Sequence, residues 1–180
     1  DEIHPIVSGN KWFKLKYHIE EAKQQQKNTI ATFGGAFSNH IVAAAFACKE
    51  AGFKSMGIIR GEKPKQFSQT LTAAQEYGMQ LHFVSREHFK NKALLKQELN
   101  NNYYWINEGG YSINGMLGAS EISQTVDATA YNFIIAACGT GTMLAGLINA
   151  ALPHQKIIGI SALKRHVGLE KDIQSILPLS

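Results

Sequence analysis

The sequence predicts an α/β fold built on parallel strands. Short apolar runs alternate with amphipathic stretches through the 180 residues, and the runs that end near residues 33 and 136 each lead into a glycine turn that opens a helix. Such alternation is typical of parallel strands joined by right-handed crossovers. The turns after such strands lie at one edge of the sheet, where ligands bind in this class of fold.

The expected elements follow one another in a regular order. Helices are expected where apolar residues recur with helical spacing, and strands where short apolar runs stand between turn residues. The expected helices cover 11–26, 38–51, 67–77, 87–100, 117–125, 143–151 and 169–176. The expected strands cover 29–33, 55–60, 80–84, 103–106, 132–136 and 156–160.

Composition indicates a globular chain of one or two domains. Apolar residues make up 44% of the chain and charged residues 18%, which excludes a disordered protein. The net charge of +4 comes from scattered lysines, so no nucleic-acid partner is expected. This balance suits an anionic cofactor and an anionic substrate.

The two cysteines, Cys48 and Cys138, form no CxxC pair, and no disulfide framework or metal site is expected. Cys48 lies in an alanine-rich run and is predicted to be a small buried residue. The sequence shows no run of about twenty apolar residues and no signal peptide. A cytoplasmic protein without a membrane partner is therefore expected.

Lys11 is the candidate reactive residue. It follows Ser8, Gly9 and Asn10 at the start of a predicted helix. Gly9 lets the backbone turn tightly, and Asn10 is expected to cap the helix. At that position the positive end of the helix dipole lowers the cost of a neutral amine, which is the form that attacks a carbonyl carbon. The alternative is a solvated lysine beside a helix cap.

The segment Gly139-Thr140-Gly141-Thr142 is the candidate phosphate site. Its glycines expose backbone N–H groups, the threonines add hydroxyl donors, and the next helix points its positive end at the anion. A dinucleotide-binding motif needs Gly or Ala where Leu144 stands, and no acid ends the next strand, so a nucleotide-binding protein is the weaker interpretation. A purely structural turn is the other alternative.

A third segment, Thr32 to His40, places Ser38 and Asn39 after a glycine turn. Together the three segments resemble the fold type II, tryptophan-synthase-like pyridoxal-phosphate enzymes, and within them the 1-aminocyclopropane-1-carboxylate deaminase/D-cysteine desulfhydrase family. The resemblance implies two parallel-sheet αβα domains, with a chain that is incomplete at its C-terminus. It implies a small domain over 28–116, flanked by large-domain pieces over 1–27 and 117–180. A homodimer is also expected.

The resemblance assigns a role to each candidate residue. Lys11 is expected to carry the aldehyde of pyridoxal 5'-phosphate, and Ser38 to act as a nucleophile or proton carrier near the substrate's α-carbon and carboxylate. The cofactor-binding residues are expected to be Lys11, Asn39, Cys138, Gly139, Thr140, Gly141 and Thr142. The substrate-binding residues are expected to be Ser38, Asn39, His40 and Tyr111. From the residues alone, Ser38 and Asn39 also suit helix capping, and His40 also suits a structural role.

The expected activity is a lyase or deaminase reaction on a small amino acid. D-cysteine desulfhydrase-like β-elimination, which gives a keto acid and ammonia, is preferred because desulfhydrase-like relatives resemble this chain in having histidine at the position of His40. Deamination of 1-aminocyclopropane-1-carboxylate is the first alternative, and a non-catalytic ligand-binding paralogue is the second. Phe37 departs from the glutamine usual in the family, which weakens the transfer of substrate specificity.

Overall fold

The computed structural model describes residues 9–99, 102–125, 127–162 and 167–178. The chain forms two compact units: unit 1 comprises Asp1–Trp12 and Ile19–Glu108, and unit 2 comprises Phe13–His18 and Gly109–Ser180. The first helix, α1 (Asn10–Gln24), contributes residues to both units. Among the described residues, no helix combines the length and the apolar character needed to cross a membrane.

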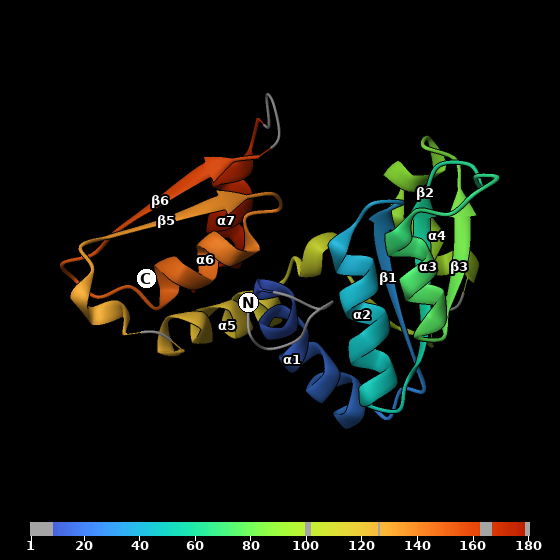
Figure 1. The fold of residues 1–180 in the computed structure, drawn as a ribbon, viewed down its shortest axis with the longest axis horizontal. Helices are drawn as coiled ribbons and strands as arrows, with labels where there is room; N and C mark the ends of the chain where they lie inside the picture. Colours follow the sequence, from blue (N-terminus) through green and yellow to red (C-terminus); the bar gives the residue numbers. More distant parts are fainter. Residues whose placement is uncertain (1–8, 100–101, 126, 163–166, 179–180) are drawn as a thin grey trace. The chain divides into compact units, whose positions relative to one another are not determined.

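Unit 1 contains a parallel sheet of four strands in the order β3-β2-β1-β4 (Figure 1). The strands are β1 (Thr29–Gly35), β2 (Lys54–Arg60), β3 (Met79–Val84) and β4 (Tyr104–Ile106). Gly35 pairs with Arg60 in the neighbouring strand, and Arg60 pairs in turn with Val84. The carboxyl ends of β1, β2 and β3 therefore lie in register at one edge of the sheet.

The two faces of this sheet are covered by different helices because successive residues of a strand point to opposite sides. On one face, Thr32 bonds to His40 of α2 (Asn39–Glu50), and α3 (Gln69–Glu76) packs beside α2 (Figure 1). On the other face, Phe33 packs with Leu95 of α4 (Lys92–Leu99) in an apolar cluster. Unit 1 is therefore a three-layer αβα arrangement.

Unit 2 contains two parallel strands, β5 (Phe133–Cys138) and β6 (Lys156–Ser161). Its helices are α5 (Ile113–Ser120), α6 (Thr142–Asn149) and α7 (Leu169–Ile176). They share an apolar core with the inward side chains of β5, so all three helices contribute to one side of this short sheet.

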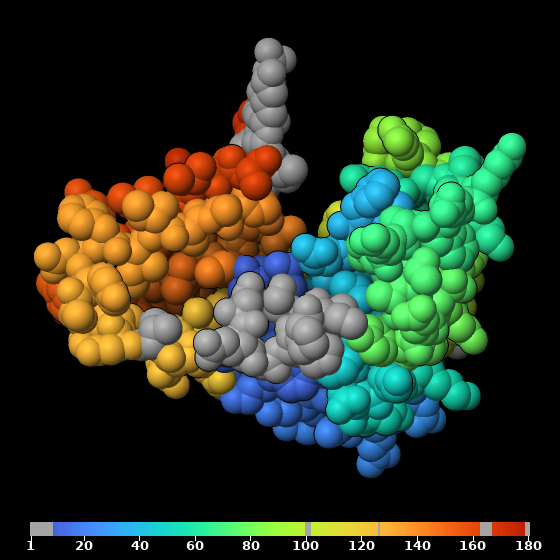
Figure 2. All heavy atoms as spheres, viewed as in Figure 1, coloured from blue at the N-terminus to red at the C-terminus, as the bar shows by residue number. Residues whose placement is uncertain are grey.

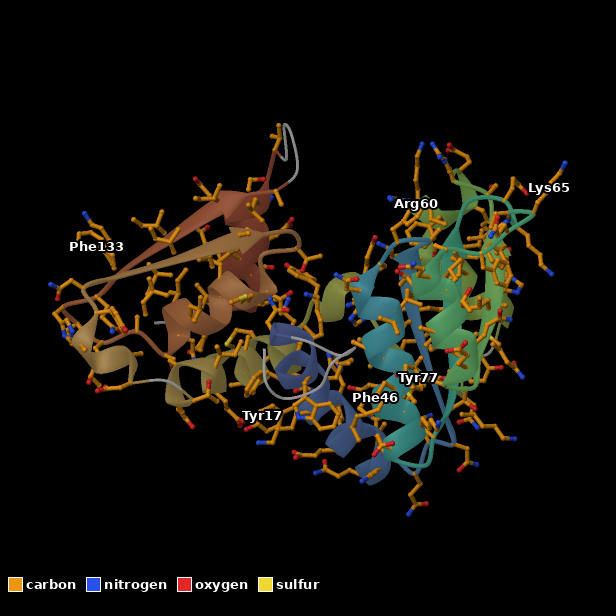
Figure 3. The ribbon with its side chains drawn as sticks, in the orientation of Figure 1. Tyr17, Phe46, Arg60, Lys65, Tyr77 and Phe133 are labelled. Atoms are coloured by element: carbon orange, nitrogen blue, oxygen red, sulfur yellow. The ribbon has the colours of Figure 1, made fainter. Side chains whose placement is uncertain are left out.

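The opposite face of β5 and β6 is apolar and exposed. Phe133 is 61% exposed, Ile135 62% and Ile160 60%, and Figure 3 shows Phe133 directed away from the helices of unit 2. Strands that are apolar on both sides are typical of parallel sheets covered on both faces. Among the described residues, the helices of unit 2 cover one face only.

The prediction of an α/β fold with two parallel sheets is confirmed. The expected strands and the helix over 169–176 match the observed elements to within two residues at each end. The burial predicted for Cys48 is also confirmed, and burial raises the pKa of its thiol to about 12. The predicted domain boundaries at 28–116 stay a prediction.

Two expected helices were placed wrongly. The helix expected over 87–100 is split into a 3-10 turn at His88–Lys90 and α4, because the Asn91 side chain accepts a bond from the Leu94 amide at 3.1 Å and starts a new helix there. The helix expected over 117–125 begins earlier, at Ile113, because Ser112 caps it through the Gly115 amide at 2.8 Å. It ends at Ser120, before a 3-10 turn at Glu121–Gln124.

Replacing Gly118 with alanine is expected to destabilise unit 2. A Cβ atom at this position would lie 1.9 Å from the backbone oxygen of Phe13, so α1 or α5 would have to shift. Overpacking of this kind costs about 1–3 kcal/mol, against a gain of about 1 kcal/mol from the better helix propensity of alanine. We expect a net loss of up to about 2 kcal/mol in the free energy of unfolding, measured by urea denaturation followed by circular dichroism.

Gly139→Ala is the matched control, because a Cβ atom there would meet nothing within 4 Å. Equal urea midpoints for the two variants would contradict the steric argument.

Candidate functional site

Lys11 is the second residue of α1 in the structure. The helix is preceded by Gly9, whose φ of 63° lies in the region that favours glycine, and no side chain forms a capping bond. The prediction that Asn10 caps the helix was therefore wrong: Gly9 takes the cap position and Asn10 is already helical. Lys11 still lies in the first turn, as expected.

The environment of Lys11 favours its neutral form. The side chain is half-buried, and burial lowers the pKa of its ammonium group below the ordinary lysine value. The first turn of α1 contains no acidic residue that would oppose this effect. Lys16, one of the neighbouring lysines, is instead paired with Glu121 at 2.9 Å. Lys11 is thus the better candidate for an attacking amine.

Ser38 occupies the N-cap position of α2 in unit 1. Its side chain makes no capping bond, so the capping role that serine prefers does not account for its hydroxyl. The turn before it is tight, since a Cβ atom at Gly34 would lie 3.0 Å from the Ser38 Oγ and 2.5 Å from Cγ1 of Ile41. Asn39 is the first helical residue and is exposed. Both polar side chains thus stand at the start of a helix.

His40 lies behind this turn and is buried. Its Nε2 lies 2.8 Å from the Thr32 Oγ1, and Thr32 donates its hydroxyl hydrogen to the Ile106 carbonyl at 3.0 Å. Because that hydrogen is already used, Thr32 accepts from His40, which assigns a proton to Nε2. His40 thereby connects α2 to β1 and β4, and its predicted contact with substrate stays a prediction.

The predicted phosphate segment lies between β5 and α6 in unit 2. Gly141 has a φ of 81° and precedes α6 with no side-chain capping bond. Thr142 is fully buried, and its Oγ1 lies 3.0 Å from the Oγ1 of Thr140. A helix start without a side-chain cap, beside two hydroxyl groups, is a fitting place for a phosphate group.

Close packing holds this segment in place. A Cβ atom at Gly109 would lie 2.7 Å from Cγ2 of Thr140, and one at Gly141 would lie 2.6 Å from Cγ1 of Ile173. Cys138 ends β5, and burial raises the pKa of its thiol, which therefore stays neutral at ordinary pH. A neutral thiol does not repel an anion bound next to it.

Tyr111 has a structural connection within unit 2. Its hydroxyl donates to the Asp172 carbonyl at 2.7 Å and lies 2.6 Å from the Ser175 Oγ, so the side chain holds the loop before α5 against α7. The substrate contact predicted for Tyr111 stays a prediction.

Sequence reasoning missed a pocket of ≈ 690 Å³ in unit 1, which Ser38, Arg60 and Arg86 help to line. The available signal was Arg60, a charged residue at the end of an otherwise apolar predicted strand. It also missed the contact between the buried His18 and Ser112, whose Nε2 and Oγ lie 2.8 Å apart in unit 2. No short motif marks either feature, since the residues are distant in the chain.

The fold and these residues define an α/β protein with a candidate reactive lysine and a candidate anion-binding turn. Residues 1–169 match the family described as pyridoxal-phosphate dependent enzyme, and the chain belongs to this family. The resemblance inferred from the sequence is thereby confirmed, and the family's cofactor is pyridoxal phosphate.

Two curated proteins show which members of the family this chain is similar to. The chain is 29% identical over 180 residues to a putative 1-aminocyclopropane-1-carboxylate deaminase of Thermotoga maritima, a match that covers 93% of this chain and 54% of the relative. It is 29% identical to the bifunctional D-cysteine desulfhydrase/1-aminocyclopropane-1-carboxylate deaminase of Arabidopsis thaliana, with 78% and 41% covered. The chain thus spans about half the length of these relatives.

A crystal structure of an ACC deaminase homologue has the same fold. It superposes with a TM-score of 0.78 at 23% identity and covers 94% of this chain and 56% of the other. This likeness supports the predicted fold type II architecture, and at 23% identity it concerns the fold alone.

Lys11 is expected to react with an amine-selective reagent at a lower pH than an ordinary lysine does. Because its pKa is lowered, a larger fraction of the Lys11 amine is neutral at a given pH than for an ordinary lysine. Only the neutral amine reacts with the reagent. Trace labelling with acetic anhydride across a pH series, read by peptide mass spectrometry, gives the midpoint for each lysine. The exposed Lys65 is the internal reference, and equal midpoints for the two lysines would show that Lys11 has no special environment.

Proposed function

We propose that the protein is a pyridoxal-phosphate dependent lyase that removes the β-substituent of a small amino acid, with D-cysteine as the substrate. The products would be sulfide, pyruvate and ammonia. The observation that carries the proposal is Lys11: a half-buried lysine with a lowered pKa, in the first turn of α1, in a chain that belongs to a pyridoxal-phosphate family.

The proposal gives Lys11 two tasks. Its Nζ atom holds the cofactor, and the same nitrogen, once free, takes the proton from the substrate's α-carbon. Both tasks need a neutral amine, which burial of the side chain favours. Bound pyridoxal phosphate supplies an electron-withdrawing ring that stabilises negative charge at that carbon.

The remaining residues bind and orient. Thr140 and Thr142 and the amides at the start of α6 hold the phosphate group, with Gly139, Gly141 and the end of β5 at Cys138 forming the turn. In unit 1, the Ser38 hydroxyl and the first amides of α2 would hold the substrate carboxylate, while Asn39 would donate to the phenolic oxygen on the cofactor ring; Ser38 and Asn39 stand at the start of α2. The absence of a capping bond from Ser38 supports this assignment.

Deamination of 1-aminocyclopropane-1-carboxylate is the second candidate, favoured by the names of the Thermotoga and Arabidopsis relatives. That substrate has no α-proton, so the reaction must begin with a nucleophile or with removal of a β-proton. Ser38 is the residue proposed for this step. D-cysteine is preferred because His40 is the residue found in desulfhydrase-like members of the family.

We also propose a cytoplasmic homodimer that acts on a small amino acid. The modest charge of +4, spread over scattered lysines, supports a small anionic partner over a nucleic acid.

Lys11→Ala is expected to abolish covalent attachment of the cofactor. The full-length protein with added pyridoxal phosphate should be yellow, and borohydride should fix the cofactor to the Lys11 peptide, as located by mass spectrometry. Lys16→Ala is the control, because that side chain is paired with Glu121 and should leave the attachment intact. Attachment that survives in Lys11→Ala would remove Lys11 from its role. A wild-type protein that stays colourless would favour the non-catalytic paralogue.

Substrate assays on the full-length protein separate the two candidate reactions. We expect sulfide and pyruvate from D-cysteine at a kcat/KM at least tenfold above that for L-cysteine, because a single proposed base, Lys11, would reach the α-proton of only one enantiomer. Turnover of 1-aminocyclopropane-1-carboxylate to ammonia and a keto acid, with no sulfide from D-cysteine, would replace the preferred reaction by the second candidate.

A further inference from the structure

The pocket of unit 1 opens at the carboxyl edge of its sheet. It has a volume of ≈ 690 Å³, which is in the range of small-molecule sites. Its lining comes from the turn after β1, the end of β2 and the segments that follow β3 and β4, and it includes Ser38, Arg60, Arg86, Phe89, Lys90 and Glu108. In Figure 2, the light-blue turn after β1 stands at the surface beside the green segment that follows β3.

The pocket has an excess of positive charge. Three cations and one carboxylate line it, a net charge of +2. The carboxylate, Glu108, is paired with Lys92 at 2.8 Å, and Lys90 is paired with Glu87 at 2.8 Å. Within the described part of the chain, neither Arg60 nor Arg86 forms an ion pair with a carboxylate. The two arginines are therefore the charges that a ligand can neutralise.

The position of Arg60 is set by its neighbours. Its guanidinium lies 5.6 Å from the centre of the Phe89 ring, and a Cβ atom at Gly35 would lie 3.7 Å from its Nη2. The exposed guanidinium thus lies at the end of β2, beside the Phe89 ring and Gly35, and Figure 3 labels Arg60 there. A planar guanidinium binds a carboxylate or sulfate through two parallel hydrogen bonds.

Ser38 belongs both to this pocket and to the proposed substrate site. It lines the pocket and occupies the N-cap position of α2, whose first amides are the proposed site of the substrate carboxylate. An amino acid bound there by its carboxylate would have Arg60 and Arg86 within the same pocket.

We propose that Arg60 and Arg86 bind a second anionic group on substrates other than D-cysteine, whose thiol side chain provides no such group. This further substrate class comprises amino acids with a carboxylate, sulfonate or sulfate on the side chain. This inference rests on the proposed function, which places the substrate carboxylate at the start of α2. All residues that line the pocket belong to unit 1.

Direct binding tests the pocket without turnover. Malonate, a small dicarboxylate, is titrated into the full-length protein without added cofactor by isothermal calorimetry at constant ionic strength, with acetate as the monoanion. We expect malonate to bind at least tenfold more tightly than acetate. Arg60→Ala and Arg86→Ala should each weaken malonate binding about tenfold, and Arg60→Lys, which keeps the charge but loses the fork, should weaken it less.

Lys65→Ala is the control for general charge, because Lys65 projects from unit 1 (Figure 3) and does not line the pocket. It should bind malonate like the parent protein, and circular dichroism checks that each variant is folded. Malonate that binds no better than acetate, or equally well to Arg60→Ala, Arg86→Ala and the parent, would overturn the inference.

A kinetic comparison tests the substrate class. O-sulfoserine and β-chloroalanine of the same hand each lose the β-substituent with its bonding electrons, as sulfate or chloride, and both yield pyruvate. We expect the ratio of their kcat/KM values to fall at least tenfold in Arg60→Ala and Arg86→Ala, and to stay unchanged in Lys65→Ala. An unchanged ratio in the arginine variants would overturn the assignment to substrate. Absence of pyruvate from both substrates, with malonate binding still dependent on the arginines, would count against the proposed function and not against the anion pocket.

Discussion

Parallel pairing of β1 with β2 on one side and β4 on the other is the constraint on which unit 1 depends. Because the strands run in the same direction, all their carboxyl ends meet at one edge. The register aligns Gly35 with Arg60 and Arg60 with Val84, so the turn that bears Ser38 and the end of β2 lie together. The pocket at this edge is a direct consequence of that register.

Neighbouring residues of β1 point to opposite faces of the sheet and take part in different contacts. Phe33 points to the α4 side and belongs to an apolar cluster, whereas Thr32 points to the α2 side and bonds His40 and the Ile106 carbonyl. These buried polar groups satisfy one another, which limits the cost of burying them. The side chains left for a ligand lie just beyond β1, where Ser38 occupies the N-cap position of α2 and its hydroxyl makes no capping bond.

Unit 2 uses the same arrangement of strand, turn and helix for a different purpose. The turn after β5 combines a left-handed glycine with two threonine hydroxyls and an uncapped helix start, and it carries no charged side chain. The proposed binding of the cofactor phosphate there would depend on backbone amides and threonine hydroxyls, whereas the proposed anion site in unit 1 would depend on arginine side chains as well.

Short stretches of the sequence by themselves determined the fold class and the positions of the two glycine turns. Alternating apolar runs predicted the parallel sheets, and the glycine turns beginning near residues 34 and 139 predicted where polar groups would emerge, because both signals depend on local sequence. The residue that begins each helix was harder to predict. Gly9 takes the N-cap position of α1 with a positive φ, whereas Asn91 and Ser112 set the starts of α4 and α5 through side-chain bonds. The tertiary structure alone decided the pairing of His40 with Thr32, the contact between His18 and Ser112, the burial that lowers the pKa of Lys11, and the grouping of Arg60 with Arg86. These features depend on burial and on contacts between distant segments, which the order of residues in a single chain does not specify.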